Sequence, residues 1–118
     1  SSNSVENSGN QWQPHGGSAP YSASKSYLNQ YIKNIGREYA NKGIVISGIM
    51  PGIMNNKESG WSKMKKNSPS KFKNYLNNFI PMGRFANFNE IAPFVLFLTS
   101  NQASYAASSI LRVDGGSL

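Results

Sequence analysis

Hydrophobic side chains recur at every third or fourth position in three stretches of this 118-residue chain. They are Leu28, Tyr31, Ile32, Ile35 and Tyr39 in the first stretch, Phe72, Tyr75, Leu76 and Phe79 in the second, and Ile91, Val95, Leu96 and Leu98 in the third. This spacing places the apolar side chains on one face of a helix. The sequence therefore predicts helices over 22–41 and 70–79, and a third helix that opens at Asn87 and buries the last set.

Local signals mark the ends of two of these helices. Gly43 follows the first helix closely, where a glycine can adopt the left-handed conformation that ends a helix. Asn87 can cap the start of the third helix, and Glu90 stands three residues later, where the carboxylate of a capping box belongs. Residues 55–69 are polar and basic and are predicted to be a loop.

Two short runs rich in β-branched residues predict strands. Residues 44–49 lead into a Pro51-Gly52 turn, and residues 110–113 precede Asp114-Gly115-Gly116. Strands that alternate with helices form a parallel sheet with helices on its faces. We therefore expect an α/β fold, in a length that fits one small domain.

The net charge of +7 is concentrated in one stretch. Six lysines stand between 57 and 73 with a single glutamate, Glu58, and they are Lys57, Lys63, Lys65, Lys66, Lys71 and Lys73. Such a stretch can recruit an acidic partner, and it can equally serve only to keep a surface loop soluble. It lacks the interleaved arginine and aromatic side chains of a nucleic-acid groove, so we expect no nucleic-acid partner.

The composition excludes several other kinds of site. The chain has no cysteine, which excludes disulfides, zinc–thiolate sites and thiol nucleophiles. The single histidine, His15, excludes a histidine-rich metal site. No apolar stretch approaches the length of about 20 residues that a membrane span needs, and residues 1–13 are too polar for a signal peptide. We expect a soluble, cytoplasmic protein without a metal.

The candidate chemistry lies at the start of the first helix, in Tyr21-Ser22-Ala23-Ser24-Lys25. Residues four apart on a helix lie on one face, so this spacing brings a phenol and an ammonium together. A cation about 4 Å from a phenol favours the phenolate by about 4 kcal/mol at an effective dielectric near 20. A phenol in that environment can exchange a proton with an alcohol or carbonyl oxygen. A pair with this spacing can also be an ordinary surface pair on a helix.

Two longer runs carry a family resemblance. The run 20–54, PYSASKSYLNQYIKNIGREYANKGIVISGIMPGIM, resembles the short-chain dehydrogenase/reductase family, and so do IPMGRF, NEIAPFVLFLTS and LRVDGG within 80–116. The segments follow the family's order and separations and look most like its 3-oxoacyl-[acyl-carrier-protein] reductases. The resemblance implies a Rossmann-like, doubly wound parallel sheet with helices on both faces, and hydride transfer between a nicotinamide and a carbonyl or alcohol.

The resemblance also implies roles for individual residues. Tyr21 would be the catalytic acid/base, and Lys25 would hold the nicotinamide ribose and stabilise the phenolate. Pro51 and Gly52 would line the nicotinamide, and the backbone of Met54 would meet its carboxamide. The segment 55–79 would be the substrate-binding loop and lid, and it contains Trp61. The residues implied to be mainly architectural are Gly83, Arg84, Asp114, Gly115 and Gly116.

The family's catalytic serine has two candidates in this chain. Ser8 stands at the family's usual distance before Tyr21, but no hydrophobic strand precedes it. Ser2, in the opening Ser1-Ser2, resembles the double serine at a strand end and requires a longer intervening loop, so we favour Ser2. In that loop, Trp12 and His15 could shape a substrate pocket, or they could simply be a packed tryptophan and a solvated histidine.

The sequence departs from the family in several places. Asn56 stands near the position of a threonine that bonds the cofactor phosphates, and Ala106-Ala107-Ser108 replaces a Thr-Gly pair before the last strand. No glycine-rich dinucleotide turn is present. We therefore expect residues 1–118 to be the C-terminal part of one NAD(P)-binding domain, inactive alone, with either NAD or NADP as the cofactor.

The resemblance implies a homodimer or homotetramer, with Tyr27, Tyr31 and Phe94 as candidate interface aromatics. It also implies a small carbonyl or alcohol substrate, which could be linked to an acidic carrier protein. A non-catalytic binding or assembly protein of the same family is the alternative, because the chain lacks the phosphate-binding turn.

Overall fold

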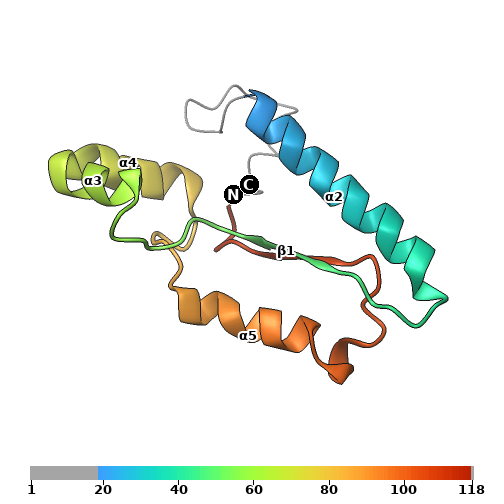
Figure 1. The fold of residues 1–118 in the computed structure, drawn as a ribbon. Helices are drawn as coiled ribbons and strands as arrows, with labels where there is room; N and C mark the ends of the chain where they lie inside the picture. The colour runs from blue at the N-terminus through green and yellow to red at the C-terminus, as the bar shows by residue number, and fades with distance from the viewer. Residues whose placement is uncertain (1–18, 118) are drawn as a thin grey trace.

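The computed structural model describes residues 19–117, which form five helical segments and two strands (Figure 1). In chain order they are α2 (Ala19–Ala40), β1 (Gly48–Pro51), α3 (Gly60–Asn67), α4 (Pro69–Phe79), α5 (Phe88–Leu98), the 3₁₀ helix η2 (Asn101–Ala103) and β2 (Ile110–Val113). The three predicted helices and the last predicted strand are confirmed. Gly43 has the predicted left-handed conformation, with φ of 74°, just after α2.

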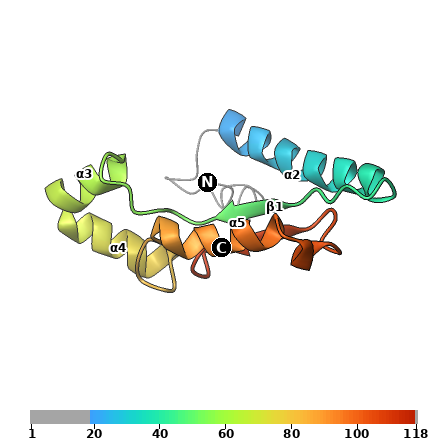
Figure 2. The ribbon, with the colours of Figure 1, turned by 60° about the horizontal axis from the view of Figure 1, so that its bottom comes forward.

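The two strands form a parallel sheet, as predicted. Gly48 pairs with Ile110 at one end of the ladder and Pro51 pairs with Val113 at the other. In two views the strands run between α2 and α5, so the two helices cover opposite faces (Figures 1 and 2). The α/β architecture with helices on both faces is therefore confirmed for the described residues.

The first strand lies further along the chain than predicted. The sequence places it at 44–49, whereas β1 is Gly48–Pro51. Ser108 lies in the segment that leads into the partner strand, and its N–H donates to the Ile46 carbonyl at 2.8 Å. Because Ser108 has a φ of 63°, that segment becomes extended only after Ser108. Because the ladder partner begins at Ile110, the β-branched residues at 44–47 have no strand beside them in the described chain.

The basic segment 55–69 is not simply a loop, because it contains α3. The Ser59 side chain caps this helix, accepting the N–H of Ser62 at 3.2 Å. Helix α3 has only two large apolar residues, Trp61 and Met64, and its other positions are glycine, lysine or polar. Two apolar residues are too few to show a helical repeat, so the apolar pattern did not predict this helix. The region 55–79 therefore contains two packed helices, α3 and α4, rather than the single predicted helix.

The apolar face predicted for α5 is only partly buried. Ile91 is 7% exposed, but Leu96 is 70% exposed and Val95 is 43% exposed, so the predicted burial of these two is wrong for the described chain. Helix α5 is apolar around most of its circumference, and a single pair of strands can cover only one side of it. On α2, Tyr27, Leu28 and Tyr31 are likewise exposed.

Helix α2 packs on the sheet through a glycine. Gly36 is buried, and a Cβ added to it would lie 2.7 Å from the Cα of Ser108 and 2.9 Å from the Ile46 carbonyl oxygen. The Ser108 hydroxyl also donates to the Lys33 carbonyl at 2.8 Å. The absence of a side chain at Gly36 therefore lets the helix and the turn before β2 touch backbone to backbone.

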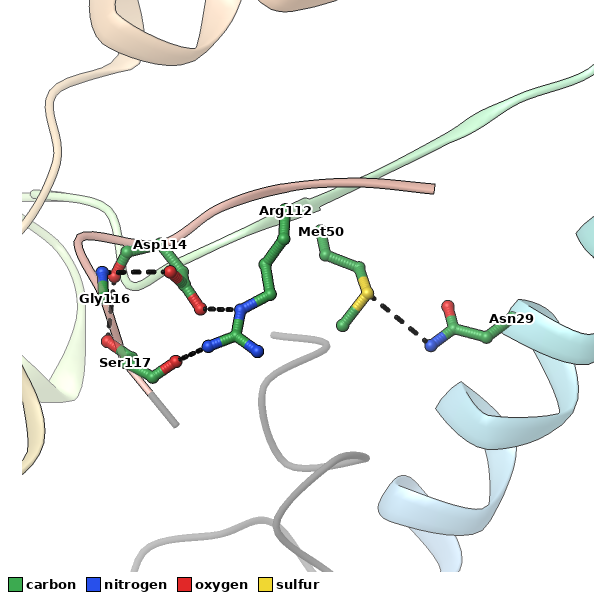
Figure 3. Close-up of polar contacts among 6 residues, drawn as sticks. All are labelled: Asn29, Met50, Arg112, Asp114, Gly116 and Ser117. Carbon is green, nitrogen blue, oxygen red and sulfur yellow. Dashed lines mark hydrogen bonds and ion pairs between the residues drawn. The ribbon is translucent and has the colours of Figure 1, made fainter. Parts of the chain in front are cut away.

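A polar cluster fixes the end of β2. The Asp114 side chain is only 6% exposed, and its carboxylate accepts from Arg112 Nε at 2.6 Å and from the Gly116 N–H at 3.1 Å (Figure 3). The guanidinium of Arg112 also donates to the Ser117 carbonyl. These bonds all hold the turn after β2, which agrees with the architectural role that the family resemblance implies for Asp114 and Gly116.

An ion pair holds the start of α5. The Arg84 guanidinium makes two bonds to the Glu90 carboxylate, at 2.6 and 2.8 Å, and that carboxylate also accepts the Asn87 N–H at 2.8 Å. Glu90 therefore takes the predicted capping-box position. The bonds from Arg84, followed by the bond from Asn87, lower the pKa of the Glu90 carboxyl from 4.5 to about 2.

This ion pair predicts an acid-dependent part of the stability. A carboxyl whose pKa is lower in the folded state stabilises the fold above its unfolded pKa, and this contribution is lost as pH falls through the folded pKa. We expect the full-length Glu90→Gln variant to lose less stability than the parent between pH 5 and pH 2, measured by urea unfolding. Glu38→Gln, an exposed change on α2, is the control, and identical acid profiles for all three proteins would contradict the expectation.

Candidate active site

Helix α2 runs antiparallel to β1, which places its first turns beyond the carboxyl end of that strand. Gly36 lies against Ile46, and a Cβ at Gly48 would lie 3.0 Å from the Ile32 side chain. One helical turn nearer the N-terminus, the Asn29 amide donates to the Met50 sulfur at 3.8 Å. Since the contacts advance along β1 as they go back along α2, the start of α2 lies on the side of the molecule to which the carboxyl end of β1 runs.

The predicted pairing of Tyr21 and Lys25 is present at this end of α2. The Lys25 Nζ lies 5.5 Å from the centroid of the Tyr21 ring, and both residues are half-buried. The Ser24 hydroxyl donates to the Tyr21 carbonyl at 2.7 Å, within the first turns of the helix. The geometry therefore places a cation over a phenol ring, an attractive arrangement in its own right.

Gly52 turns the chain tightly across the end of the sheet. Its N–H donates to the Val113 carbonyl at 2.9 Å, and an added Cβ would lie 2.7 Å from the Cα of Asp114. Only a residue without a side chain fits between these two backbones. Pro51 is the last residue of β1, so the Pro51-Gly52 turn is fixed directly to the ends of both strands.

The backbone of Met54 is presented on one side of a short bridge. Met54 pairs with Ala86 in a parallel bridge, in which the Asn55 N–H donates to the Ala86 carbonyl at 2.7 Å and the Ala86 N–H donates to the Ile53 carbonyl at 3.0 Å. In a parallel ladder the bonds on one side come from the flanking residues. The N–H and C=O of Met54 itself therefore face the other side, where they can meet an amide group.

Trp61 belongs to an aromatic cluster between α3, α4 and the segment before α5. Its ring centroid lies 4.4 Å from that of Tyr75 and 5.6 Å from that of Phe85, and Phe72 and Phe79 extend the cluster. Burial raises the pKa of the Tyr75 phenol. The two helices of the predicted lid are thus joined by aromatic rings packed in tilted and edge-on arrangements, while their lysines lie exposed.

The remaining predicted site residues are placed as follows. Ser2, Ser8, Trp12 and His15 lie outside the described residues. The Asn56 side chain closes its own turn by accepting the Glu58 N–H at 3.0 Å. Over residues 19–117, no group of three or more metal-binding side chains is found.

The same part of the chain contains no helix that is both long and apolar enough to cross a membrane.

Sequence comparison places these features in a known family. The profile described as enoyl-(acyl carrier protein) reductase matches residues 7–117. The structure resembles a variant of a short-chain dehydrogenase/reductase from Serratia marcescens, with a TM-score of 0.72 at 28% identity over 98% of this chain. The chain belongs to the short-chain dehydrogenase/reductase family.

Several members of this family resemble the chain over most of its length. It is 38% identical over 100 residues, 85% of the chain, to the 3-oxoacyl-[acyl-carrier-protein] reductase FabG of Buchnera aphidicola. It is 36% identical over 96 residues, 81% of the chain, to a galactitol 2-dehydrogenase (L-tagatose-forming) of Cereibacter sphaeroides. These matches cover 38% and 36% of the relatives, so the chain spans less than two fifths of their length.

A structure of a family member with a bound cofactor is also similar. The L-sorbose reductase of Gluconobacter frateurii, complexed with NADPH and L-sorbose, has a TM-score of 0.74 at 27% identity, covering 98% of this chain and 44% of that one. The Rossmann-like fold expected from the sequence is therefore confirmed for this short-chain dehydrogenase/reductase segment.

One contact near the Tyr21–Lys25 pair was not anticipated from the sequence. Asn29 follows Lys25 by four residues and Tyr21 by eight, so helical spacing alone puts it near their face. Its partner, Met50, precedes the Pro51-Gly52 turn, and this proximity appears only when α2 is docked on β1.

Proposed function

We propose that this chain is the proton-transfer part of an NAD(P)-dependent oxidoreductase that acts on a carbonyl or alcohol substrate. The observation that carries the proposal is the Tyr21–Lys25 pair at the end of α2 that points to the carboxyl end of β1. Ligands of open α/β sheets bind outside the carboxyl ends of the strands. The family's relatives include two reductases and a dehydrogenase, which supports the same reaction class.

The described helices support a larger parent domain. A parallel sheet is normally covered on both faces and is seldom built from two strands. Exposed apolar side chains on α2 and α5, such as Leu28 and Leu96, are what a domain core looks like when part of its cover is absent from the described chain. We propose that residues 1–118 are the C-terminal part of one Rossmann-like domain, with 55–79 as its substrate-binding loop.

The residues after β1 fit a nicotinamide cofactor, NAD or NADP. Gly52 is fixed at the end of the sheet by its close approach to the Asp114 backbone, and the outward N–H and C=O of Met54 complement a carboxamide. Pro51 and Gly52 would line the nicotinamide, and Lys25 and Tyr21 would hold its ribose hydroxyls. When bound, this cofactor supplies or accepts the hydride.

The protein's own part in the reaction is to hold the substrate and move one proton. Tyr21 gives its hydroxyl proton to the carbonyl oxygen in reduction, or takes it back in oxidation. Lys25 stabilises the charge that remains on the phenol. Ser2, or alternatively Ser8, hydrogen-bonds the same oxygen, and the lid of α3 and α4 with Trp61 excludes water from the site.

A non-catalytic binding or assembly protein of the same family is the second candidate, because the chain contains no glycine-rich phosphate turn. Titration of the full-length protein with NADH and NADPH, followed by nicotinamide fluorescence, separates the two. Saturable binding supports the oxidoreductase. No binding at millimolar cofactor would favour the assembly role.

The lysines of 57–73 favour a substrate carried by an acidic partner protein. These side chains are exposed around α3 and α4, the proposed lid, so a bound acidic carrier would lie beside the site. The relatives from Buchnera aphidicola and Chlamydia muridarum are reductases of acyl-carrier-protein substrates. We therefore propose a carrier-linked acyl group as the substrate class.

Removing three of these charges should weaken a carrier-linked substrate selectively. We expect full-length Lys63→Ser/Lys65→Ser/Lys66→Ser to raise KM for carrier-linked substrate by roughly threefold or more at low salt, since each exposed ion pair contributes about 0.2–1 kcal/mol. The salt dependence of KM should also flatten. The control removes three exposed charges elsewhere, Lys33, Arg37 and Lys42, and an unchanged salt response in the lid variant would reject the carrier.

The exposed aromatic pair on α2 favours self-association of the full-length protein. Tyr27 is 71% exposed and Tyr31 is 49% exposed, and their rings stack with centroids 6.1 Å apart. Phe94 offers a further exposed ring on α5. A homodimer or homotetramer that buries these rings completes the proposal.

A further inference from the structure

The contact between Asn29 and Met50 joins the two halves of the proposed site. Figure 3 shows the Asn29 amide extending from α2 toward the Met50 side chain on β1, with its Nδ2 3.8 Å from the sulfur. Met50 is 4% exposed and Asn29 is half-buried. One side of this contact belongs to the helix of Tyr21 and Lys25, and the other belongs to the residue just before the Pro51-Gly52 turn.

Because of its position on α2, this contact can affect the orientation of Tyr21. The described contacts of α2 with the sheet and the turn before β2 include those of Gly36, Lys33, Ile32 and Asn29, and among these the contact of Asn29 lies nearest to Lys25, one turn away. Tyr21 lies about 12 Å further toward the helix start than Asn29, at about 1.5 Å of rise per residue. A small rotation of α2 at Asn29 would therefore be carried to the phenol.

The contact between Asn29 and Met50 is better suited to orienting helix α2 than to stabilising the fold. A thioether is a weak acceptor, so the bond contributes little to folding. It is directional, however, because the amide N–H must point at the sulfur, whereas apolar contacts such as Ile32 against Gly48 set spacing without fixing rotation. A displacement of about 1 Å at reacting groups can cost about 10²-fold in rate.

We infer that Asn29, through Met50, is a positioning residue that sets the orientation of Tyr21 relative to the cofactor turn. This inference rests on the proposed oxidoreductase function. Asn29 acts through Met50, by fixing the rotation of α2 on β1, and not through contact with substrate or cofactor.

The test is steady-state kinetics of full-length Asn29→Leu, a change that keeps the size of the side chain and removes its N–H. We expect kcat to fall by roughly three- to tenfold, because a weak contact can bias the orientation of the helix only by about its own free energy, while substrate KM and the cofactor Kd stay within about twofold. The matched control is Gln30→Leu, the same chemical change at the adjacent exposed position, where the amide bonds only to Asn34 on its own helix.

Met50→Leu provides a second, independent variant. It retains a buried side chain of similar volume and removes the sulfur, so it should lower kcat to a similar extent. The double variant Asn29→Leu/Met50→Leu should be no slower than the slower single variant, because both changes remove one contact. If Asn29→Leu does not fold, Met50→Leu decides the question alone.

Two outcomes would overturn the inference. In one, kcat of both single variants stays within twofold of the Gln30→Leu control. In the other, the two losses multiply in the double variant. Tyr21→Phe measured alongside separates this inference from the proposed function: if Tyr21→Phe keeps its turnover, the oxidoreductase assignment fails, whereas if only the Asn29 and Met50 variants behave normally, the positioning role alone fails.

Discussion

Replacing Tyr21 with phenylalanine in the full-length protein is expected to lower kcat by about 10²–10⁴-fold, the usual contribution of a positioned acid or base. The change removes one oxygen and leaves the ring beneath the Lys25 ammonium, 5.5 Å from its centroid. The cation–ring contact and the helix should therefore survive. The loss should then appear in the proton-transfer step alone.

The measurement is kcat with saturating substrate, together with a nicotinamide fluorescence titration of the same variant. Cofactor affinity should fall only modestly, because the contacts proposed for Lys25, Gly52 and Met54 with the nicotinamide nucleoside remain. Tyr105→Phe is the matched control, since Tyr105 is exposed in the turn after η2 and the same hydroxyl is removed. Near-parental turnover by Tyr21→Phe would sink the assignment of Tyr21 as the acid/base.

Replacing Gly36 with alanine is expected to destabilise the full-length protein by about 1–3 kcal/mol, the usual cost of forcing extra atoms into a packed interior. The added Cβ would lie 2.7 Å from both the Cα and the N of Ser108. These are backbone atoms, so they cannot move aside as a flexible side chain would. Helix α2 must shift away from the sheet instead.

The direction of the change in stability distinguishes a tightly packed glycine from a glycine at an exposed helix position. Alanine in place of glycine inside an exposed helix normally stabilises it by about 0.8–1 kcal/mol. Gly60→Ala, at the start of α3 where an added Cβ meets nothing within 4 Å, should therefore be neutral or stabilising. Urea unfolding of the two variants tests the contrast, and a Gly36→Ala variant as stable as Gly60→Ala would show that α2 does not dock on the turn at Ser108.

The shift of α2 in Gly36→Ala should also change the position of Tyr21 and lower turnover. Ser108 holds α2 by a bond to the Lys33 carbonyl as well as by the close approach to Gly36. Tyr21 lies near the start of the same helix, so a displaced helix also moves the phenol relative to the carboxyl end of β1. Stability and turnover are therefore expected to fall together in this variant, unlike in Tyr21→Phe.

Much of the fold could be predicted from local pattern. The helices α2, α4 and α5 were predicted because each repeats its apolar residues at the helical period, and Glu90 identified the start of α5 because a capping box depends on residues three apart. The strand β1 was placed too early, since β-branched residues favour an extended chain without saying where a partner strand lies. Helix α3 was missed because lysines dominate it.

The sequence by itself determined the helices α2, α4 and α5, the strand β2 and the pairing of Tyr21 with Lys25. These depend on short-range spacing, and helical residues four apart meet whatever the rest of the chain does. The parallel arrangement followed from the alternation of strands and helices along the chain. The family resemblance carried by the runs 20–54 and 80–116 supplied the identity of the fold, which sequence and structure comparison confirmed.

Only the tertiary structure decided which segments meet. The approach of Gly36 to Ser108, the crossing of Gly52 over Asp114 and the contact of Asn29 with Met50 each join residues more than 20 positions apart. Such contacts depend on the direction and rotation of a helix on a sheet, which are set by the sum of many packing interactions rather than by any local pattern. For the same reason Val95 and Leu96, apolar in a predicted buried face, are exposed where the described chain provides nothing to cover them.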